Sequence, residues 1–409
     1  MSAASPPSPD ARRLFATRAL RGFADGTVSV LLASHLSSLG WSPVEIAAVV
    51  TGTLLGSAVV TLGVGLLGGR VPQRRMLIAI AILMVATGLG FFGLTSFWPL
   101  FAVAVVGTLN PSSGDVSAFL PVEQAVLSES VPAEGRTLAF ARYNLSGSLA
   151  GALGALASGV PTGLALRLHR DPAGAPRWAF LMYSAIGALA ALLYRGLARE
   201  GTSRPMRPRA PLAKSRAVVV RLAMLFSVDA AGSGFVVQSL LALWLFRRFG
   251  LSIATTGAVF FGMSVLAAFS QLVSARLAAR FGLIRTMIYT HLPANVFLVL
   301  AAFMPNATLA VVFLLLRMSM ASMDVPARQS YVMSVVPPEE RAAAASVTNV
   351  PRSLAAATTP LLAGALLART SFGWPLVCGG LAKILYDVLL LLQLRSKKLA
   401  EERPVDARR

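Results

Sequence analysis

The chain has 409 residues, of which 56% are hydrophobic and only 13% are charged, and its formal net charge is +20. This composition excludes an ordinary soluble globular protein. Lysine and arginine occur in short connectors between apolar runs rather than along one polar face. The positive charge therefore predicts membrane topology and not nucleic-acid binding.

Apolar runs of about 20 residues recur along the chain, which is the length that a helix needs to cross about 30 Å of hydrocarbon. We predict an all-α integral membrane protein with twelve transmembrane helices. These cover residues 14–37, 43–66, 76–96, 98–126, 138–162, 178–196, 217–246, 252–275, 286–304, 307–333, 342–368 and 373–394. Six spans (14–196) precede a basic linker at 197–216 and six (217–394) follow it, with tails at 1–13 and 395–409, the second predicted to be disordered.

The connectors also predict the orientation of the chain. Most lysines and arginines outside the spans lie in the tails, in the linker and in every second connector. Because positively charged connectors stay in the cytoplasm, both termini and the linker are predicted to be cytoplasmic. Arginine far outnumbers lysine, which is typical of GC-rich bacterial genomes and predicts a multi-pass protein of the plasma (inner) membrane.

Two repeated sequence segments indicate an internal duplication. The stretch Gly65–Arg75, GLLGGRVPQRR, recurs 210 residues later as Ala275–Arg285, ARLAARFGLIR, and Pro72 falls on Gly282. At an offset of 205, Pro121–Arg136 matches Pro326–Arg341 in its Pro, Gln, Glu and Arg positions. Two matches at nearly one period predict that a whole bundle of helices is duplicated.

The first repeated segment, Gly65–Arg75, resembles the loop between helices two and three of the major facilitator superfamily. The resemblance implies two pseudo-symmetric six-helix bundles that rock around a central site, a small-molecule substrate and a monomer. It also implies a gating loop, which here contains Gly65, Arg70, Arg74, Arg75, Arg280 and Arg285. The acidic residue of the family pattern is absent, because Gly69 and Ala279 stand in its place.

The drug–proton antiporters of that family carry an arginine in helix four and a glycine-proline motif in helix five. Helix four of this chain has no arginine. Helix five offers Gly147, Gly151 and Gly154, with Ala152 where proline is expected. Close helix packing through small residues is the alternative interpretation of these glycines.

Ionisable residues inside spans are costly and usually face the protein interior or a water-filled cavity, so each is a candidate for function. The proton-coupling candidates on helices one, four, seven and ten are Asp25, Asp115, Asp229 and Asp324. A carboxylate that moves between apolar surroundings and an arginine can take up and release a proton. Static salt bridges are the alternative, because Arg21 and Asp25, Asp324 and Arg328, and Lys383 and Asp387 are each spaced four residues apart on one helix face.

The candidates for substrate binding are Arg317, Arg352, Asn349 and His291. Two arginines near the midplane could hold an anionic group through their planar sets of donors, or could pair with Asp324. A histidine in a span titrates near neutrality or serves as a packing residue. Prolines are predicted to interrupt the fourth span at Asn110-Pro111 and the eleventh at Asn349-Val350-Pro351, either for gating or as structural kinks.

An enzyme is disfavoured, because the sequence has no paired-histidine metal motif, no nucleophile elbow and no phosphate loop. We expect no cofactor and no metal, and Cys378 reads as a buried apolar residue. The sequence predicts a secondary transporter that uses protons to export a small organic molecule, an antiporter in a lipid membrane. Uptake of an organic anion or nutrient is the alternative, and a sensor with a transporter fold is a minor one.

Overall fold

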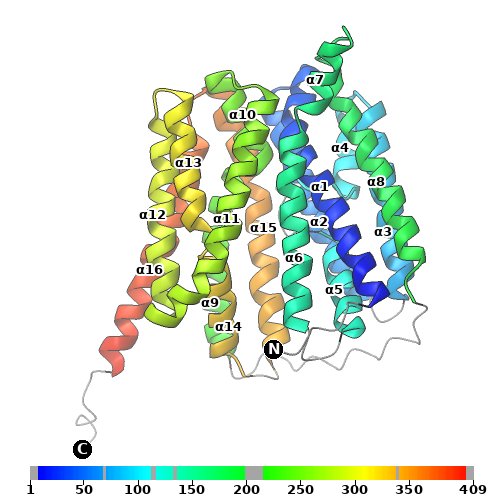
Figure 1. The fold of residues 1–409 in the computed structure, drawn as a ribbon. Coiled ribbons are helices and arrows are strands. Elements are labelled where there is room, and N and C mark those ends of the chain that lie inside the picture. The colour runs from blue at the N-terminus through cyan, green and yellow to red at the C-terminus, as the bar shows by residue number, and fades with distance from the viewer. Residues whose placement is uncertain are drawn as a thin grey trace, which may run out of the picture.

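The computed structural model describes residues 8–67, 71–111, 117–131, 136–198, 215–337 and 340–401. Within these ranges all regular structure is helical. The helices run side by side, and helix α1 begins at the same end of the molecule at which α16 finishes (Figure 1). We call this end the terminal end and the other the opposite end.

Helices of the first half of the chain alternate between the two ends. They are α1 (Pro9–Ser38), α2 (Pro43–Leu67), α3 (Gln73–Gly93), α4 (Phe97–Val106), α5 (Phe119–Ser130), α6 (Arg136–Ala157), α7 (Val160–Arg167), the short 3-10 helix η2 (Ala175–Arg177) and α8 (Trp178–Arg195). The second half contains α9 (Arg216–Phe235), α10 (Gln238–Phe249), α11 (Ile253–Phe281), α12 (Leu283–Phe303), α13 (Ala307–Ala321), α14 (Asp324–Val335), α15 (Arg341–Arg369) and α16 (Trp374–Glu401).

Local sequence signals set several helix ends. Ser8 and Asn306 accept hydrogen bonds from backbone N–H groups in the first turns of α1 and α13, which are otherwise unpaired there. The turn predicted at Pro72 and Gly282 is confirmed: Pro72 directly precedes α3, and Gly282 alone separates α11 from α12. Gly282 has φ of +85°, a conformation that favours glycine.

Some of the breaks in the helices lie at the prolines where the sequence predicted them. The span around Asn110-Pro111 is divided into α4 and α5, as predicted. The prediction that Pro351 interrupts α15 is wrong, since that helix runs unbroken past both Pro351 and Pro360. Membrane helices tolerate proline because neighbouring groups satisfy the freed carbonyls, and α15 packs along both α9 and α2. Three breaks were not predicted, between α6 and α7, between α9 and α10, and between α13 and α14.

The tail predicted to be disordered begins as a continuation of a helix. Helix α16 extends to Glu401 rather than ending near residue 394. The connector at 163–177 likewise contains the end of α7 and the short η2.

Nine helical segments of the described ranges are long and apolar enough to cross a membrane. Three of the predicted spans do not meet this criterion: α1 carries several charges, and the spans made of α4 with α5 and of α13 with α14 are broken. Large apolar side chains are exposed on the outer faces of the helices, among them Trp98, Phe269 and Tyr289. Such a surface fits hydrocarbon and not water, so the chain is a multi-helix membrane protein.

The two halves of the chain meet mainly through α2 with α15 and α6 with α11. Gly364 approaches Ala47 and the Pro43 carbonyl so closely that an added Cβ would lie 2.2 Å from the Ala47 Cβ. Gly159 meets Ala254 in the same way. Both contacts lie at the opposite end.

In the described ranges, the buried apolar clusters also join the two halves at the opposite end only. One buried cluster joins residues of both halves, including Val28 and Leu241. On the terminal side of the second half, a separate cluster contains Leu225, Met287 and Leu390, and its members come from that half alone. Among the described residues, the halves are therefore sealed together at the opposite end and not at the terminal end.

Candidate functional site

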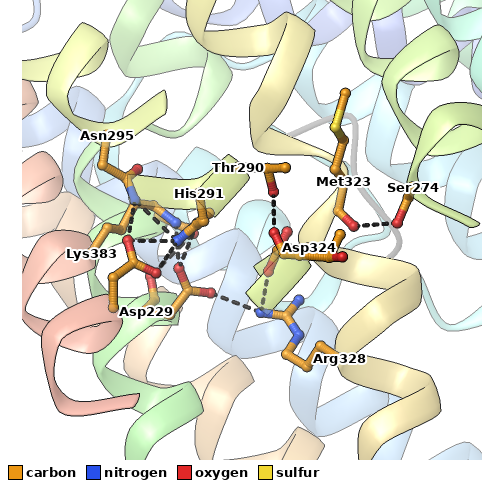
Figure 2. A network of polar contacts seen from close by, with 12 residues as sticks. Asp229, Ser274, Thr290, His291, Asn295, Met323, Asp324, Arg328 and Lys383 are labelled. Atoms are coloured by element: carbon orange, nitrogen blue, oxygen red, sulfur yellow. Dashed lines mark hydrogen bonds and ion pairs between the residues drawn. The ribbon is translucent and has the colours of Figure 1, made fainter. Parts of the chain in front are cut away.

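A buried network of charges lies inside the second half and is centred on Asp229 of α9. Lys383 Nζ of α16 lies 2.7 Å from Asp229 Oδ1, and Arg328 Nη1 of α14 lies 3.0 Å from Asp229 Oδ2 (Figure 2). Arg328 Nη1 also lies 3.2 Å from Asp324 Oδ2. All four side chains are buried. A buried charge without a partner is unfavourable, so removal of one member of the network would destabilise the charges that remain.

His291 of α12 extends the network to a third carboxylate. Its Nδ1 lies 2.9 Å from Asp387 Oδ1, and its Nε2 lies 3.5 Å from Asp229 Oδ1. Asn295, one turn further along α12, donates from Nδ2 to Asp387 Oδ2 at 3.1 Å. The imidazole is thus placed between two carboxylates that belong to different helices, α9 and α16.

Two of the three ion pairs predicted from a spacing of four residues do not form. Lys383 pairs with Asp229 and Asp387 binds His291, so the two α16 residues are not paired with each other. Arg21 pairs with Glu123 rather than with Asp25. The third prediction, Asp324 with Arg328, is confirmed. In each failed case a partner on another helix offers a closer oppositely charged group than the neighbouring turn does.

The first half has its own buried cluster, around Glu123 of α5. Arg21 of α1 donates to this carboxylate, as do Thr17 at 2.8 Å, Tyr194 at 2.5 Å and Tyr143. Glu123 is fully buried. Four donors saturate the carboxylate, which is the arrangement of a static structural anchor.

The Glu123 and Asp229 clusters each contain an arginine–acid pair, but the helices that carry the arginine and the acid are exchanged. In the first half the arginine lies on α1 and the acid on α5, whereas in the second half the acid lies on α9 and the arginine on α14. Arg328 stands 205 residues after Glu123, which is the offset of the sequence repeat. Each arginine also lies over a phenylalanine ring from the helix of its acid, Phe119 at 4.1 Å and Phe226 at 5.6 Å. Each half of the duplicated scaffold thus contains a buried arginine–acid salt bridge, with the two partners on exchanged helices.

Among the described residues, Asp25 differs from every other buried acid in the spans. It lies one turn from Arg21 on α1, keeps 9% of its surface exposed, and has no hydrogen bond or ion pair of its own among the residues that the structure describes. Arg18 and Arg21 act on it only at longer electrostatic range, and Tyr183 of α8 lies within the same range.

Arg317 and Arg352 approach the Asp229 network from α13 and α15. Both are half-buried. Arg352 lies within electrostatic range of Asp229, Asp324 and Arg328, and Arg317 within that of Asp229. No salt bridge between Arg317 and Asp324 forms. Together with His291, three of the four predicted substrate-binding residues therefore lie around one acid.

Several predicted site residues fall outside the described part of the chain. They are Asp115, Arg70 and the side chain of Asn349, whose backbone belongs to α15. Gly65 lies in the last turn of α2. The remaining arginines of the predicted gating loop, Arg74, Arg75, Arg280 and Arg285, form no ion pair within the described ranges, which fits the absence of the family's acid there.

The breaks in the fourth and seventh spans meet each other across the two halves. Ser239, in the first turn of α10, donates its backbone N–H to the Pro111 carbonyl at 3.2 Å. Its hydroxyl lies 2.9 Å from the same carbonyl and 2.8 Å from the Ser29 carbonyl of α1. A carbonyl freed by the irregular backbone of one half is therefore satisfied by the other half.

The glycines of the fifth span serve close packing. A Cβ on Gly26 would lie 2.0 Å from the Gly151 carbonyl oxygen, and one on Gly154 would lie 2.0 Å from that of Phe23. The small residues let α1 and α6 touch backbone to backbone. This packing explains the glycine pattern without an antiporter motif.

Sequence reasoning missed the functional placement of Lys383, Asp387 and Asn295. The two charged residues were visible as ionisable groups within a span, but their spacing favoured mutual pairing. Asn295 carried no signal beyond its place one turn from His291.

A bundle of apolar helices with buried charges that form ion pairs between helices defines an integral membrane protein of the transporter class. The chain belongs to the Major Facilitator Superfamily, whose family model matches residues 14–350 and 222–409. It is 24% identical over 402 residues to the uncharacterized membrane protein YJR124C of Saccharomyces cerevisiae, with 90% of each chain covered.

Solved transporters share the fold. The nucleoside transporter NupG has a TM-score of 0.75 at 11% identity, covering 94% of this chain and 99% of its own. A D-xylose-proton symporter has a TM-score of 0.70 at 14% identity, covering 93% of this chain and 97% of its own.

 The family and these neighbours indicate a transporter of small molecules rather than an enzyme.

Proposed function

We propose that the chain is a secondary transporter of twelve spans, arranged as two six-helix bundles (14–196 and 217–394) that rock around a central site. In this proposal it is a monomer in the lipid of the plasma membrane, and its terminal end faces the cytoplasm. The seal at the opposite end, made by Gly364 with Ala47 and by Gly159 with Ala254, supports an inward-facing conformation.

Proton coupling is the mechanism that the geometry supports best, and Asp25 is the observation that carries it. An ionised carboxylate without a partner in these surroundings costs several kcal/mol. A proton on Asp25 removes that cost, and Arg18 or Arg21, which both act on Asp25 electrostatically, can balance the carboxylate after the proton leaves. Exchange between these two partners is the chemistry that a proton-driven carrier requires.

Export of a small organic molecule remains the proposed direction, on the basis of the family and not of the helix-five glycines. Uptake of an organic anion is the second candidate, and Arg317 and Arg352 favour it. Both residues are half-buried and lie within electrostatic range of Asp229. A carboxylate or phosphate group would find two sets of planar donors there.

The test is transport in sealed proteoliposomes that contain the purified full chain. A pH gradient is imposed in either direction, and the probes are ethidium as a cation, uridine and D-xylose as neutral molecules, and benzoate as an anion. Flux that follows the gradient supports proton coupling, and its sign gives the direction. Flux of a probe that is unchanged when the gradient is collapsed would contradict coupling and leave a facilitator.

The charge class of the substrate follows from the same assay. If benzoate is the transported probe, Arg317→Gln and Arg352→Gln should each raise its KM, whereas the exposed Arg167→Gln should not. If only ethidium or the neutral probes move, the anion candidate is excluded.

A further inference from the structure

We propose that Asp229, His291 and Asp387 form a second proton-binding site, located in the second half of the chain, in which His291 holds a proton between the two carboxylates. This inference rests on the proposed function for its role in coupling, but the site is argued from its own geometry. It brings α16 into the transport machinery.

The argument begins with the two ring nitrogens of His291. Nδ1 faces both oxygens of Asp387, at 2.9 and 3.1 Å, and Nε2 faces Asp229 Oδ1 at 3.5 Å. A neutral imidazole has one N–H and one lone pair. It would therefore turn a lone pair toward one of the carboxylates. Only the doubly protonated ring offers an N–H to both.

Asn295 supports the same assignment. Its Nδ2 donates to Asp387 Oδ2 at 3.1 Å and lies 3.0 Å from His291 Nδ1. With Nδ1 protonated, the amide and the ring are two donors that converge on one carboxylate. With Nδ1 unprotonated, the ring could accept from Asn295, but its lone pair would face both oxygens of Asp387.

The charges nearest His291 come from three other helices. They are Asp229 on α9, Asp324 and Arg328 on α14, and Lys383 and Asp387 on α16, with the Tyr386 ring edge-on at 5.8 Å. Arg317 and Arg352 act at longer range on Asp229. The ion-paired cluster holds three acids against Arg328 and Lys383, so a proton on His291 supplies the third positive charge.

Proton binding at this site changes how three helices are joined. The site takes up one proton from solvent, converting imidazole to imidazolium, and no bond between heavy atoms forms or breaks. The bound proton ties α12 to both α9 and α16. Its release leaves one N–H, so the ring can keep only one of the two carboxylates. Asp229 lies on the span that continues into α10, where Ser239 contacts the first half.

The chain offers a direct measurement, because it contains only three histidines. His169 is exposed and His35 is buried beside the Phe180 ring, without a carboxylate partner in the described ranges. The full chain is labelled with [15N]histidine in lipid nanodiscs, and the imidazole nitrogens are observed by NMR. His291→Gln assigns its signal; if that variant does not fold, His35→Gln and His169→Gln assign it by elimination.

We expect the His291 signal to show two protonated nitrogens at neutral pH in the wild type, and a neutral ring in Asp387→Asn. The His35 and His169 signals are the internal controls and should be the same in both proteins. A neutral His291 tautomer that Asp387→Asn leaves unchanged would overturn the site. That result leaves the proposed function standing if wild-type flux still follows the pH gradient; flux that ignores the gradient contradicts the proposed function instead.

Discussion

Lys383 and Asp387 lie one turn apart on α16, yet each binds a residue of a different helix: Lys383 Nζ lies 2.7 Å from Asp229 Oδ1, and Asp387 lies 2.9 Å from His291. The last helix is therefore joined by charge to α9 and α12. The spacing predicted that Lys383 and Asp387 would neutralise each other, whereas in the structure each connects α16 to a different helix.

Replacement of Lys383 by Met should destabilise the protein by about 3–5 kcal/mol at most, because it removes one cation paired with buried Asp229 and leaves Arg328 as the other. The double variant Asp229→Asn with Lys383→Met should recover much of that loss, since no unpaired charge remains at this contact. Thermal unfolding in detergent measures both. Additive losses in the double variant would show that the two residues are not coupled.

The Glu123 cluster should behave as a structural anchor. Glu123→Gln leaves Arg21 buried without its ion-pair partner, so we expect a loss of about 3–5 kcal/mol and little folded protein. Tyr194→Phe removes one hydrogen bond to a charged group and should cost about 1.5–3 kcal/mol. Size-exclusion profiles of the detergent-solubilised variants test this. A well-folded Glu123→Gln protein that has lost only transport would assign Glu123 to function instead.

Close contact between α1 and α6 predicts opposite effects for two glycine substitutions. Gly26→Ala places a Cβ 2.0 Å from a backbone oxygen, so the helices must separate, at a cost of about 1–3 kcal/mol. Gly63→Ala, in α2, meets no atom within 4 Å and should be neutral or gain up to about 1 kcal/mol. Melting temperatures of the two variants decide the matter, and equal values would refute the packing explanation of the glycines.

Ser239 should hold the opposite end closed. Ser239→Ala removes the hydroxyl contacts to Pro111 and Ser29 but keeps the backbone bond, a loss of about 1 kcal/mol or about a fivefold shift in the balance of conformations. In a Cys378→Ser background, Ser34→Cys reports access to a pocket of about 650 Å³ at that end. Maleimide labelling of Ser34→Cys should accelerate with Ser239→Ala, while labelling of an exposed Thr95→Cys should not. Equal rates at Ser34→Cys would contradict the role of Ser239.

Much of the architecture could be read from the sequence, because its signals are local or periodic. Span length predicted the helices, and the repeat at Pro72 and Gly282 predicted matching turns. The break at Asn110-Pro111 was visible for the same reason. The continuous α15 was not, because whether a helix survives Pro351 depends on its neighbours.

The sequence identified the charged residues of the candidate site but not which of them form ion pairs. Ionisable residues in apolar runs identified Asp229, His291 and Arg328 as candidates. Which charge meets which depends on how helices far apart in sequence are packed, and spacing along one helix gave the wrong partners for Lys383 and Arg21. Asp25 became distinctive only when the structure showed that Asp229 and Asp324 are paired with other residues.

The most direct test of the account compares Asp25→Asn with the wild type and with Asp171→Asn, an exposed acid in the connector after α7. Proteoliposomes carrying each protein are given a pH gradient, and the flux of the transported probe is measured with and without it. We predict that Asp25→Asn folds normally and loses gradient-driven flux but keeps exchange of probe across the membrane at equal pH, whereas Asp171→Asn behaves as wild type. Gradient-driven flux of wild-type size in Asp25→Asn would contradict the assignment of Asp25 as the coupling residue.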